Sequence, residues 1–318
     1  MARIDFFSSR FHYTFAAHRP TLTIKPGDSM RVICPDSDNM LSDGTLLPES
    51  QRQRDASVAL EGNPMAGPIA IEGAEPGDCV SVLLDEIELD RGWGQTGLAP
   101  AHGVLPQGML GSTAPPKHLY RWTIDRAAGV ARVENPLGER PISVPMNPFV
   151  GCIGVCPGSG ASVPTLYSGA FGGNMDLPML RAGATVLLPV FHPDGLLMMG
   201  DIHAAQGHGE IIGGAIETSG VIACTIDLLK RQAPPAPIVI DHTHISAVGL
   251  DADLRQAVER AYANLLDWVV TGTGLNRWDA YNLISQTGEV VVGNLLAPPY
   301  PVAARLPRAV LPPTGAAK

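Results

Sequence analysis

A run of small residues between positions 200 and 220 contains several side chains that can bind metals or carry protons. Glycine and alanine recur through the segment GDIHAAQGHGEIIGGAIETSG, and the ionisable side chains among them are Asp201, His203, His208, Glu210 and Glu217. Carboxylate oxygens and imidazole nitrogens are ligands of zinc-class ions, and both groups also transfer protons. Because the small residues leave room for a ligand to approach, we expect a metal or acid–base site here.

Asp201 and His203 are spaced for a shared metal ion. In an extended segment, residues two apart point to the same face of the strand. We therefore predict that the Asp201 carboxylate and the His203 imidazole bind one divalent ion. A second interpretation stays open, in which Asp201 closes a turn and His203 makes only a local hydrogen bond.

Two glutamates follow in the same segment. Glu217 is predicted to share a strand face with Gly213 and Ala215, and a carboxylate buried in so apolar a strand needs a cation or a proton. The alternative is that the glycines mark a bulge and that Glu217 lies on the surface. Glu210 and His208 are flanked by glycines and either could transfer a proton, although His208 is more simply explained as a solvated loop histidine.

A second polar pair follows two glycines further upstream. Asn174 and Asp176 come directly after Gly172 and Gly173, whose N–H groups could hold the carbonyl oxygen of a substrate. A structural turn would use the same residues equally well. Two weaker candidates for substrate binding lie at the ends of predicted strands: His192, since a lone histidine is more often packed than catalytic, and Asp36, which a turn explains equally well.

The elements that must position these residues are predicted to be mostly strands. Apolar or alternating segments recur at residues 21–34, 67–89, 184–191, 211–229 and 237–249. The turn signals Pro26-Gly27-Asp28 and Pro76-Gly77-Asp78 predict a tight hairpin within each of the first two segments. The expected fold class is α+β, mainly β, as one domain over residues 1–318 with two β-rich, sandwich-like or barrel-like sub-lobes at about 1–160 and 161–318.

Helices are predicted only near the C-terminal end. Residues 251–272 have apolar side chains at helical spacing, with Asp251 or Asp253 as a cap at the start and Gly272 at the end. A shorter helix is predicted over about 276–286. The proline-rich stretch that follows, 297–318, is expected to lie extended along the surface or against a partner subunit.

Composition limits the kinds of partner. The net charge of −9 opposes binding to nucleic acid and to anionic membranes, because the summed field repels phosphate. The five cysteines are few and scattered, which is typical of packed, reduced thiols. The N-terminal residues lack the pattern of a signal peptide, and no apolar run approaches the roughly 20 residues of a membrane-spanning helix. We expect a cytoplasmic protein with no nucleic-acid or membrane partner.

Several ordered motifs resemble the acetamidase/formamidase family. GGNMDLPML, followed by LLPVFHPDGLLMMGDIHAAQGHGEIIGGAIETSG, is similar to the central motif of that family, and GNPMAGPIAIEGAEPGDCVSVLLDEIEL resembles an earlier one. PFVGCIGVCP and LNRWDAYNLISQTGEVVVGNLLAP also fit, so the resemblance covers roughly residues 20–300. It implies hydrolysis of small amides to a carboxylate and ammonia, a β-rich fold, a divalent metal and a homo-oligomer.

Two positions depart from the family pattern. His208 stands where the family has aspartate in Q-G-D-G-E, and Phe171 stands where it commonly has a histidine before G-G-N. Both changes favour a substrate that is larger or more apolar than formamide.

The hypothesis that follows is hydrolysis of a small amide by a water activated at a divalent metal, with zinc as the expected ion. The roles it assigns are metal binding by Asp201, His203 and Asp176, proton transfer by Glu217 or Glu210, and binding of the substrate oxygen by Asn174 with the backbone of Gly172 and Gly173. A serine or cysteine nucleophile is the alternative among enzymes, although the sequence has no G-x-S-x-G motif and Cys152 and Cys156 lie in a predicted buried strand and turn. The alternative outside enzymes is a ligand-binding or scaffold protein with a structural metal.

Overall fold

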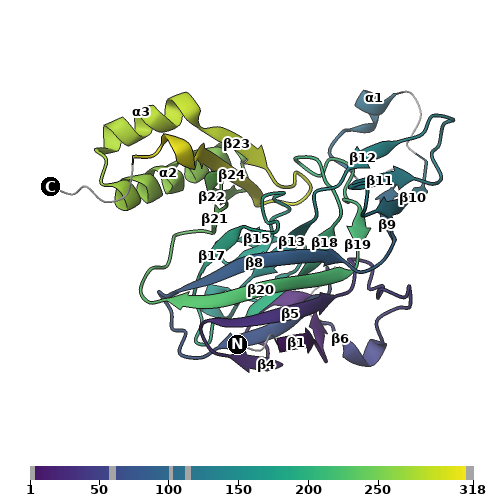
Figure 1. The fold of residues 1–318 in the computed structure, drawn as a ribbon, viewed down its shortest axis with the longest axis horizontal. Coiled ribbons are helices and arrows are strands. Elements are labelled where there is room, and N and C mark those ends of the chain that lie inside the picture. Colours follow the sequence, from purple (N-terminus) through teal and green to yellow (C-terminus); the bar gives the residue numbers. More distant parts are fainter. Residues whose placement is uncertain (1–3, 57–61, 100–102, 112–115, 313–318) are drawn as a thin grey trace.

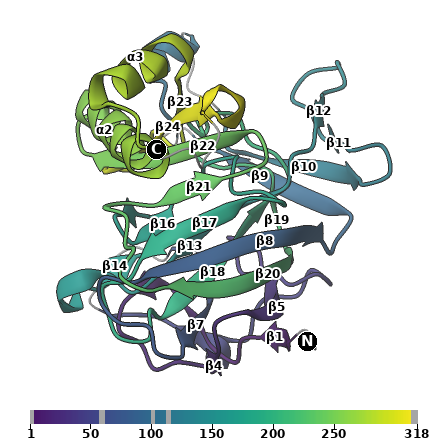
Figure 2. The same cartoon turned by 60° about the vertical axis from the view of Figure 1, so that its left-hand side comes forward.

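Most of the structure consists of two large β-sheets that pack face to face, with helices at one end (Figures 1 and 2). The computed structural model describes residues 4–56, 62–99, 103–111 and 116–312. Within these ranges the strands form a nine-stranded sheet, a thirteen-stranded sheet and a two-stranded sheet, and there are three α-helices. The prediction of an α+β fold dominated by strands is confirmed.

The nine-stranded sheet combines strands from the whole length of the chain. In spatial order its strands are β1 (Ile4–Phe7), β5 (Asp28–Cys34), β20 (Gly220–Leu229), β8 (Cys79–Leu89), β17 (Thr185–Pro189), β21 (Ile238–Ile240), β22 (His244–Asp251), β24 (Tyr300–Pro307) and β23 (Glu289–Val292). The predicted sub-lobe boundary near residue 160 stays a prediction, but strands from both sides of it alternate here.

The thirteen-stranded sheet carries the candidate site. Its main path runs through β12 (Ser143–Pro145), β11 (Val130–Val133), β10 (His118–Asp125), β9 (Trp93–Leu98), β19 (Glu217–Thr218), β18 (Leu197–His203), β13 (Phe149–Gly154), β16 (Gly172–Asn174) and β15 (Ser168–Gly169). A branch adds β7 (Met65–Ile71), β2 (Phe11–His12), β4 (Leu22–Ile24) and β6 (Arg52–Gln53), and the small separate sheet pairs β3 (Thr14–Phe15) with β14 (Val163–Pro164). Strands β9 to β12 extend from the body of the protein as an arm (Figure 1).

The main core lies between the two large sheets. Ile69 of β7, Val82 of β8, Ile153 of β13 and Ile222 of β20 are all buried in one hydrophobic cluster. These four side chains come from both sheets, so burial of apolar surface joins the layers. A second cluster lies between the β22–β24 end of the nine-stranded sheet and the two C-terminal helices.

The two Pro-Gly-Asp turns have the predicted chemistry but not the predicted topology. Asp28 accepts a hydrogen bond from the Lys25 N–H at 2.9 Å, and Asp78 accepts one from the Glu75 N–H at 2.9 Å. The strands that these turns join do not pair with each other, because β4 and β7 belong to the thirteen-stranded sheet and β5 and β8 to the nine-stranded sheet. The hairpin prediction is therefore wrong, and each turn instead carries the chain from one sheet to the other.

The helix pair matches the prediction closely. Helix α2 (Leu254–Thr273) is capped by Asp253, whose carboxylate accepts from the Gln256 N–H, and α3 (Arg277–Thr287) is capped by Asn276. The end of α2 is Gly274 in a left-handed conformation, two residues beyond the predicted Gly272. The third helix, α1 (Gln107–Leu110), is a single turn near the arm. None of the described helices is long and apolar enough to cross a membrane.

Two other expectations are corrected. Residues 300–307 of the proline-rich stretch form β24, a largely buried strand that pairs on both sides, and 313–318 lie outside the described residues.

Residues 211–216 form a turn and irregular backbone, so Glu217 does not share a strand face with Gly213 and Ala215. Gly213 has φ +90°, a conformation that glycine adopts without strain and that ends the strand pattern there.

Gly249 sets how closely α2 approaches the sheet. A Cβ at this position would lie 2.2 Å from the Ala261 backbone nitrogen and 2.3 Å from the Ala257 carbonyl oxygen. Gly249→Ala is expected to push α2 away from β22 and to lower the free energy of unfolding by about 1–3 kcal/mol. Denaturant unfolding measures this change.

Gly272→Ala is the matched control. It adds the same methyl group within α2, where nothing lies within 4 Å, and alanine has the better helix propensity. We expect unchanged or slightly higher stability. Equal effects of the two substitutions would contradict the role assigned to Gly249.

Candidate metal and active site

Five buried ionisable side chains converge at the centre of the thirteen-stranded sheet. They come from β18, the start of β19, the segment after β16 and the loop after β18, and they are Asp176, Asp201, His203, Glu210 and Glu217. None of the five is more than 8% exposed. The sequence prediction placed all five at one site, and the structure brings them together.

His203 is the centre of this cluster. Its Nε2 lies 3.3 Å from Asp201 Oδ1 and 3.3 Å from Glu217 Oε2. One potential ligand atom from each of Asp176, Asp201 and His203 lies within 4.8 Å of the others, and the same holds for His203, Glu210 and Glu217. His203 is thus shared by two overlapping groups, each of which has the donor types that zinc-class ions accept.

Gln206 fixes which nitrogen of His203 faces the acids. The Gln206 Nε2 group donates to the backbone carbonyls of Asp176 at 2.9 Å and Gly293 at 3.3 Å. Because both partners only accept, the Gln206 oxygen must be the atom 2.9 Å from His203 Nδ1. His203 Nδ1 therefore carries a proton, and Nε2 is the nitrogen that faces the carboxylates.

Three asparagine amides hold the outer oxygens of the two aspartates. Asn63 Nδ2 donates to Asp201 Oδ2 at 2.7 Å, and Asn174 Nδ2 and Asn294 Nδ2 donate to Asp176 Oδ2 at 2.9 and 2.8 Å. Asp176 Oδ1 is buried and has no hydrogen-bond partner. A buried carboxylate oxygen with no donor is costly unless a cation or proton meets it.

The cluster contains more negative charge than its imidazole can neutralise. Burial, followed by repulsion from Asp201, raises the pKa of Asp176 to about 7. Burial and then repulsion from Asp176 raise the pKa of Glu210 well above its ordinary value. Burial opposes the charged form of His203, but Glu217 and Asp201 outweigh it and raise the pKa of His203 well above its ordinary value. A cation among these groups would relieve the same repulsion.

Gly151 of β13 has no side chain, and this leaves room for the cluster to lie directly against the strand. A Cβ there would lie 2.7 Å from Asp201 Oδ2, 2.8 Å from Asp176 Oδ1 and 2.8 Å from His203 Cε1. The unpartnered Asp176 oxygen and the mixed oxygen and nitrogen donors both fit a divalent ion. The residues present are thus suitable for the metal that the sequence predicted.

The backbone at three acids is strained. Asp176, Asp201 and Glu210 have φ values of +47°, +61° and +47°, in the left-handed region that residues with a Cβ adopt rarely. Such conformations cost on the order of 1–3 kcal/mol each and persist where surrounding contacts impose them. Here the asparagine amides and Gln206 supply contacts of that kind.

A solvent-accessible cavity of about 560 Å³ opens onto the cluster, and we call it the acidic cavity. Its walls include Asp38, Asp201, His203, Glu210 and Glu217, and no lysine or arginine is among the described residues that line it. Asp38 accepts from Gln95 Nε2 at 2.5 Å, and Gln95 in turn pairs with Glu217 across β9 and β19. A small substrate that enters this cavity can thus reach the buried acids.

Two of the predicted substrate-binding residues, Asp36 and His192, line neither this cavity nor the apolar one described below. Asp36 is fully buried and pairs with Arg91 at 2.6 Å, and Arg91 also donates to the Glu217 carbonyl at 3.3 Å, so Asp36 supports the backbone of the site from behind. His192 lies in the turn after β17, where its Nδ1 is 2.7 Å from the Pro193 carbonyl. These two predictions have no support in the geometry.

The predicted oxyanion site is also not formed. Gly172 and Gly173 pair with Gly154 and Ile153 of β13 and line neither of these two cavities. Asn174 does line the acidic cavity, but its amide accepts from Asn63 at 3.0 Å and donates to Asp176. Its Nδ2 group is thus engaged with Asp176.

The most informative residues that the sequence prediction missed are Asn63, Asn294, Gln206 and Gly151. A signal was present for two of them, because Asn63, Asn174 and Asn294 each follow a glycine directly. At Gly293, for example, a Cβ would lie 1.8 Å from the Met175 carbonyl oxygen. Three Gly-Asn pairs from distant parts of the chain thus meet at one site because glycine permits close backbone approach.

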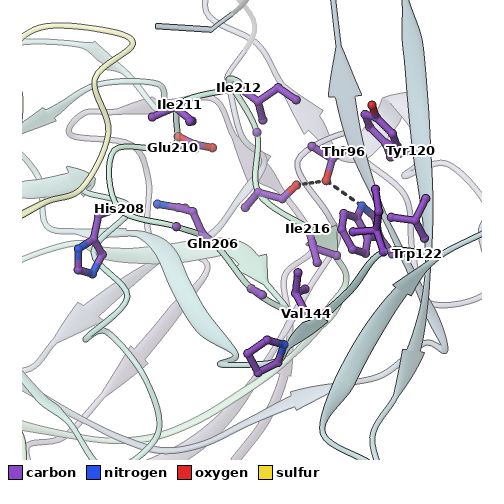
Figure 3. A pocket seen from close by; sticks show the side chains of 17 residues that line it. Thr96, Tyr120, Trp122, Val144, Gln206, His208, Glu210, Ile211, Ile212 and Ile216 are labelled. Carbon is purple, nitrogen blue, oxygen red and sulfur yellow. Dashed lines mark hydrogen bonds between the residues drawn. The ribbon is translucent and has the colours of Figure 1, made fainter. Parts of the chain in front are cut away.

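A second cavity, of about 580 Å³, adjoins the first across the loop that follows β18 (Figure 3). We call it the apolar cavity. Trp122, Tyr120, Val144 and Ile216 are on its walls, together with Glu210, which also lines the acidic cavity. The exposed His208 lines only this second cavity.

The sequence profile of the Acetamidase/Formamidase family matches this chain over residues 6–163 and 161–310. The chain belongs to this family. The predicted resemblance is thereby confirmed, and so is the prediction that the protein is an amidase.

Named relatives agree with this assignment. The chain is 26% identical over 311 residues to a formamidase of Methylophilus methylotrophus, which covers 77% of this chain and 75% of that protein. The crystal structure of an acetamidase from Yersinia enterocolitica is similar with a TM-score of 0.81 and 32% identity over 96% of this chain and 91% of the other. That of a predicted acetamidase/formamidase from Thermoanaerobacter tengcongensis has a TM-score of 0.79 and 26% identity over 98% of both chains.

The two residues that depart from the family pattern lie in different places. Phe171 is buried and packs against Phe15 with ring centroids 5.2 Å apart, outside both cavities. His208 is on the wall of the apolar cavity. Only the second departure therefore borders a space that a substrate can occupy.

Filling the space at Gly151 should remove the metal site. In Gly151→Ala, the added methyl group overlaps both aspartates, so we expect affinity for zinc to fall about 10- to 100-fold. Zinc content after dialysis against buffered zinc measures the effect. Gly92→Ala, which adds a methyl where nothing lies within 4 Å, should bind zinc like the unaltered protein. Unchanged zinc content in folded Gly151→Ala would contradict the location of the site.

Proposed function

We propose that this protein hydrolyses the C–N bond of a small amide to a carboxylate and ammonia, with a water activated at a divalent metal ion, zinc by preference. The observation that carries the proposal is the convergence of four carboxylates around His203, next to Gly151. Membership of the amidase family supplies the reaction class.

Asp176, Asp201 and His203 are the proposed metal ligands. Hydrogen bonds already hold each of these three side chains. Asn294 and Asn174 donate to Asp176, Asn63 donates to Asp201, and the Gln206 side-chain oxygen accepts from His203. A zinc-class ion, when bound, lowers the pKa of a water to about 7 and polarises a carbonyl oxygen. Ligands oriented in this way need little rearrangement to receive it.

Glu217 is the proposed proton shuttle. Its Oε1 accepts from the Ala215 N–H at 2.8 Å, which fixes the carboxylate, while Oε2 lies 3.3 Å from His203 Nε2. In the reaction the water oxygen bonds to the carbonyl carbon and the C–N bond breaks. Glu217 Oε2 takes the proton from the water and delivers it to the leaving nitrogen, so that ammonia departs and no electrons are exchanged.

Glu210 is the alternative for this proton transfer. It is buried, belongs to the second group around His203 and faces both cavities. Glu217 is preferred because a backbone N–H holds it in place, whereas no hydrogen bond to the Glu210 carboxylate is found within the described structure.

The geometry disfavours a cysteine nucleophile. Cys152 is fully buried, and burial raises the pKa of its thiol well above the ordinary value. Burial likewise raises the pKa of Cys156, to about 11. A thiol held protonated and away from solvent is a poor nucleophile.

Removal of the metal separates the enzyme from a scaffold with a structural ion. If the metal is catalytic, dialysis against a chelator should abolish ammonia release from formamide and acetamide while the melting temperature stays within a few degrees, and added zinc should restore turnover. A large loss of melting temperature at chelation would instead favour the structural role. Failure of the zinc-loaded protein to release ammonia from any amide would overturn the proposal.

Substitution of Glu217 tests the proton shuttle. Glu217→Gln keeps the shape of the side chain, so we expect bound zinc to remain and kcat to fall about 10²- to 10⁴-fold. His192→Ala, outside the two cavities, should keep the full kcat. If kcat falls in Glu210→Gln and not in Glu217→Gln, Glu210 rather than Glu217 is the proton shuttle.

A further inference from the structure

The apolar cavity has the walls of a binding pocket for a flat hydrophobic group. Tyr120 and Trp122 of β10 form one side, and Ile212 and Ile216 of the loop after β18 lie opposite (Figure 3). Its volume of about 580 Å³ lies within the usual range for pockets that bind small molecules. Ile211 and Ile142 on its rim are 54% and 43% exposed, so the pocket is open to solvent.

The polar atom of the Trp122 side chain already has a hydrogen-bond partner within the protein. Trp122 Nε1 donates to Thr96 Oγ1 at 3.1 Å, and Thr96 Oγ1 donates to the Ala215 carbonyl at 2.5 Å (Figure 3). The Trp122 ring therefore offers an apolar face to an occupant without a donor that needs pairing. Such a wall favours an aromatic or aliphatic group over a polar one.

The apolar cavity shares its inner wall with the acidic cavity. Glu210 and Gly214 line both, and Gln206 of the apolar cavity contacts His203. Gly214 has no side chain to close this wall, and a Cβ there would meet only Glu217 Oε1, at 3.8 Å. A molecule in the apolar cavity can therefore place one end beside Glu217.

We propose that the apolar cavity is an acyl-group subsite, and that the preferred substrates are primary amides with an aryl group on the acyl side. This inference rests on the proposed amide hydrolysis in the acidic cavity. The ring lies between Trp122 and Ile216, and the carboxamide passes Gly214 to reach His203 and Glu217. Formamide and acetamide fill only the acidic end and leave the apolar walls in contact with water.

Phenylacetamide and acetamide make a matched pair for the test, since they differ only by the ring. With zinc-loaded protein, kcat/KM from ammonia release is expected to be about 10- to 100-fold higher for phenylacetamide, the scale of discrimination by an apolar pocket. Calorimetric titration with the product carboxylates tests the pocket without turnover, and phenylacetate should bind more tightly than acetate.

A substitution inside the apolar cavity should remove this preference. Val144 lines that cavity and is half-buried on β12, so Val144→Phe fills the space and is expected to lower kcat/KM for phenylacetamide at least about tenfold more than for acetamide. Val130→Phe is the matched control. Val130 is also half-buried, lies on the neighbouring strand β11 with its side chain on the opposite face, and lines neither cavity.

The outcomes separate this inference from the proposed function. Equal kcat/KM for both amides, or equal loss for both in Val144→Phe, would overturn the acyl-group subsite and leave amide hydrolysis intact. Absence of ammonia from every amide would overturn the proposed function. In that case the titrations still test the acyl-group subsite. Tighter binding of phenylacetate than of acetate, abolished by Val144→Phe, would support the subsite, and equal binding of both carboxylates would overturn it.

Discussion

The rest of the site depends on one electrostatic constraint, which is the burial of four carboxylates around a single imidazole. In a medium of low polarity such charges repel strongly unless protons or a cation intervene. Three features of the surrounding structure accommodate this burial. Asparagine amides donate to the outer oxygens of Asp176 and Asp201, Gln206 orients His203 Nε2 toward the carboxylates, and Gly151 leaves room for the cluster against β13. The left-handed backbone at Asp201 is tolerated because these contacts hold it.

The sequence was informative where chemistry is local. The two-residue spacing of Asp201 and His203 predicts a shared face, and both caps of the C-terminal helices follow from short-range hydrogen bonding. The same local rules failed at the Pro-Gly-Asp turns, since a turn is set by its own residues but the partner of each strand is chosen by packing across the whole chain. Asn63 and Asn294 were missed for that reason, because their importance arises from contacts 138 and 118 residues away.

The loop after β18 joins the two cavities into one functional region. It carries Gln206, which orients the imidazole, then Glu210, which faces both spaces, and then Gly214, which keeps the wall between them thin. Its residues are held at one side by β9, through Gln95 and Glu217, and at the other by the segment around Gly293. The stretch from Gln206 to Gly214 thus borders both cavities and also contacts the imidazole.

The contact between Asn294 and Asp176 has a consequence for the order of events during synthesis. Asn294, whose amide donates to Asp176, is translated after both C-terminal helices, so all four acids of the cluster are synthesised before this last donor. Until Asn294 has been added, Asp176 Oδ2 can have only one of its two amide donors, Asn174. The hydrogen bonds that hold Asp176 are thus completed only after the helix pair has been synthesised.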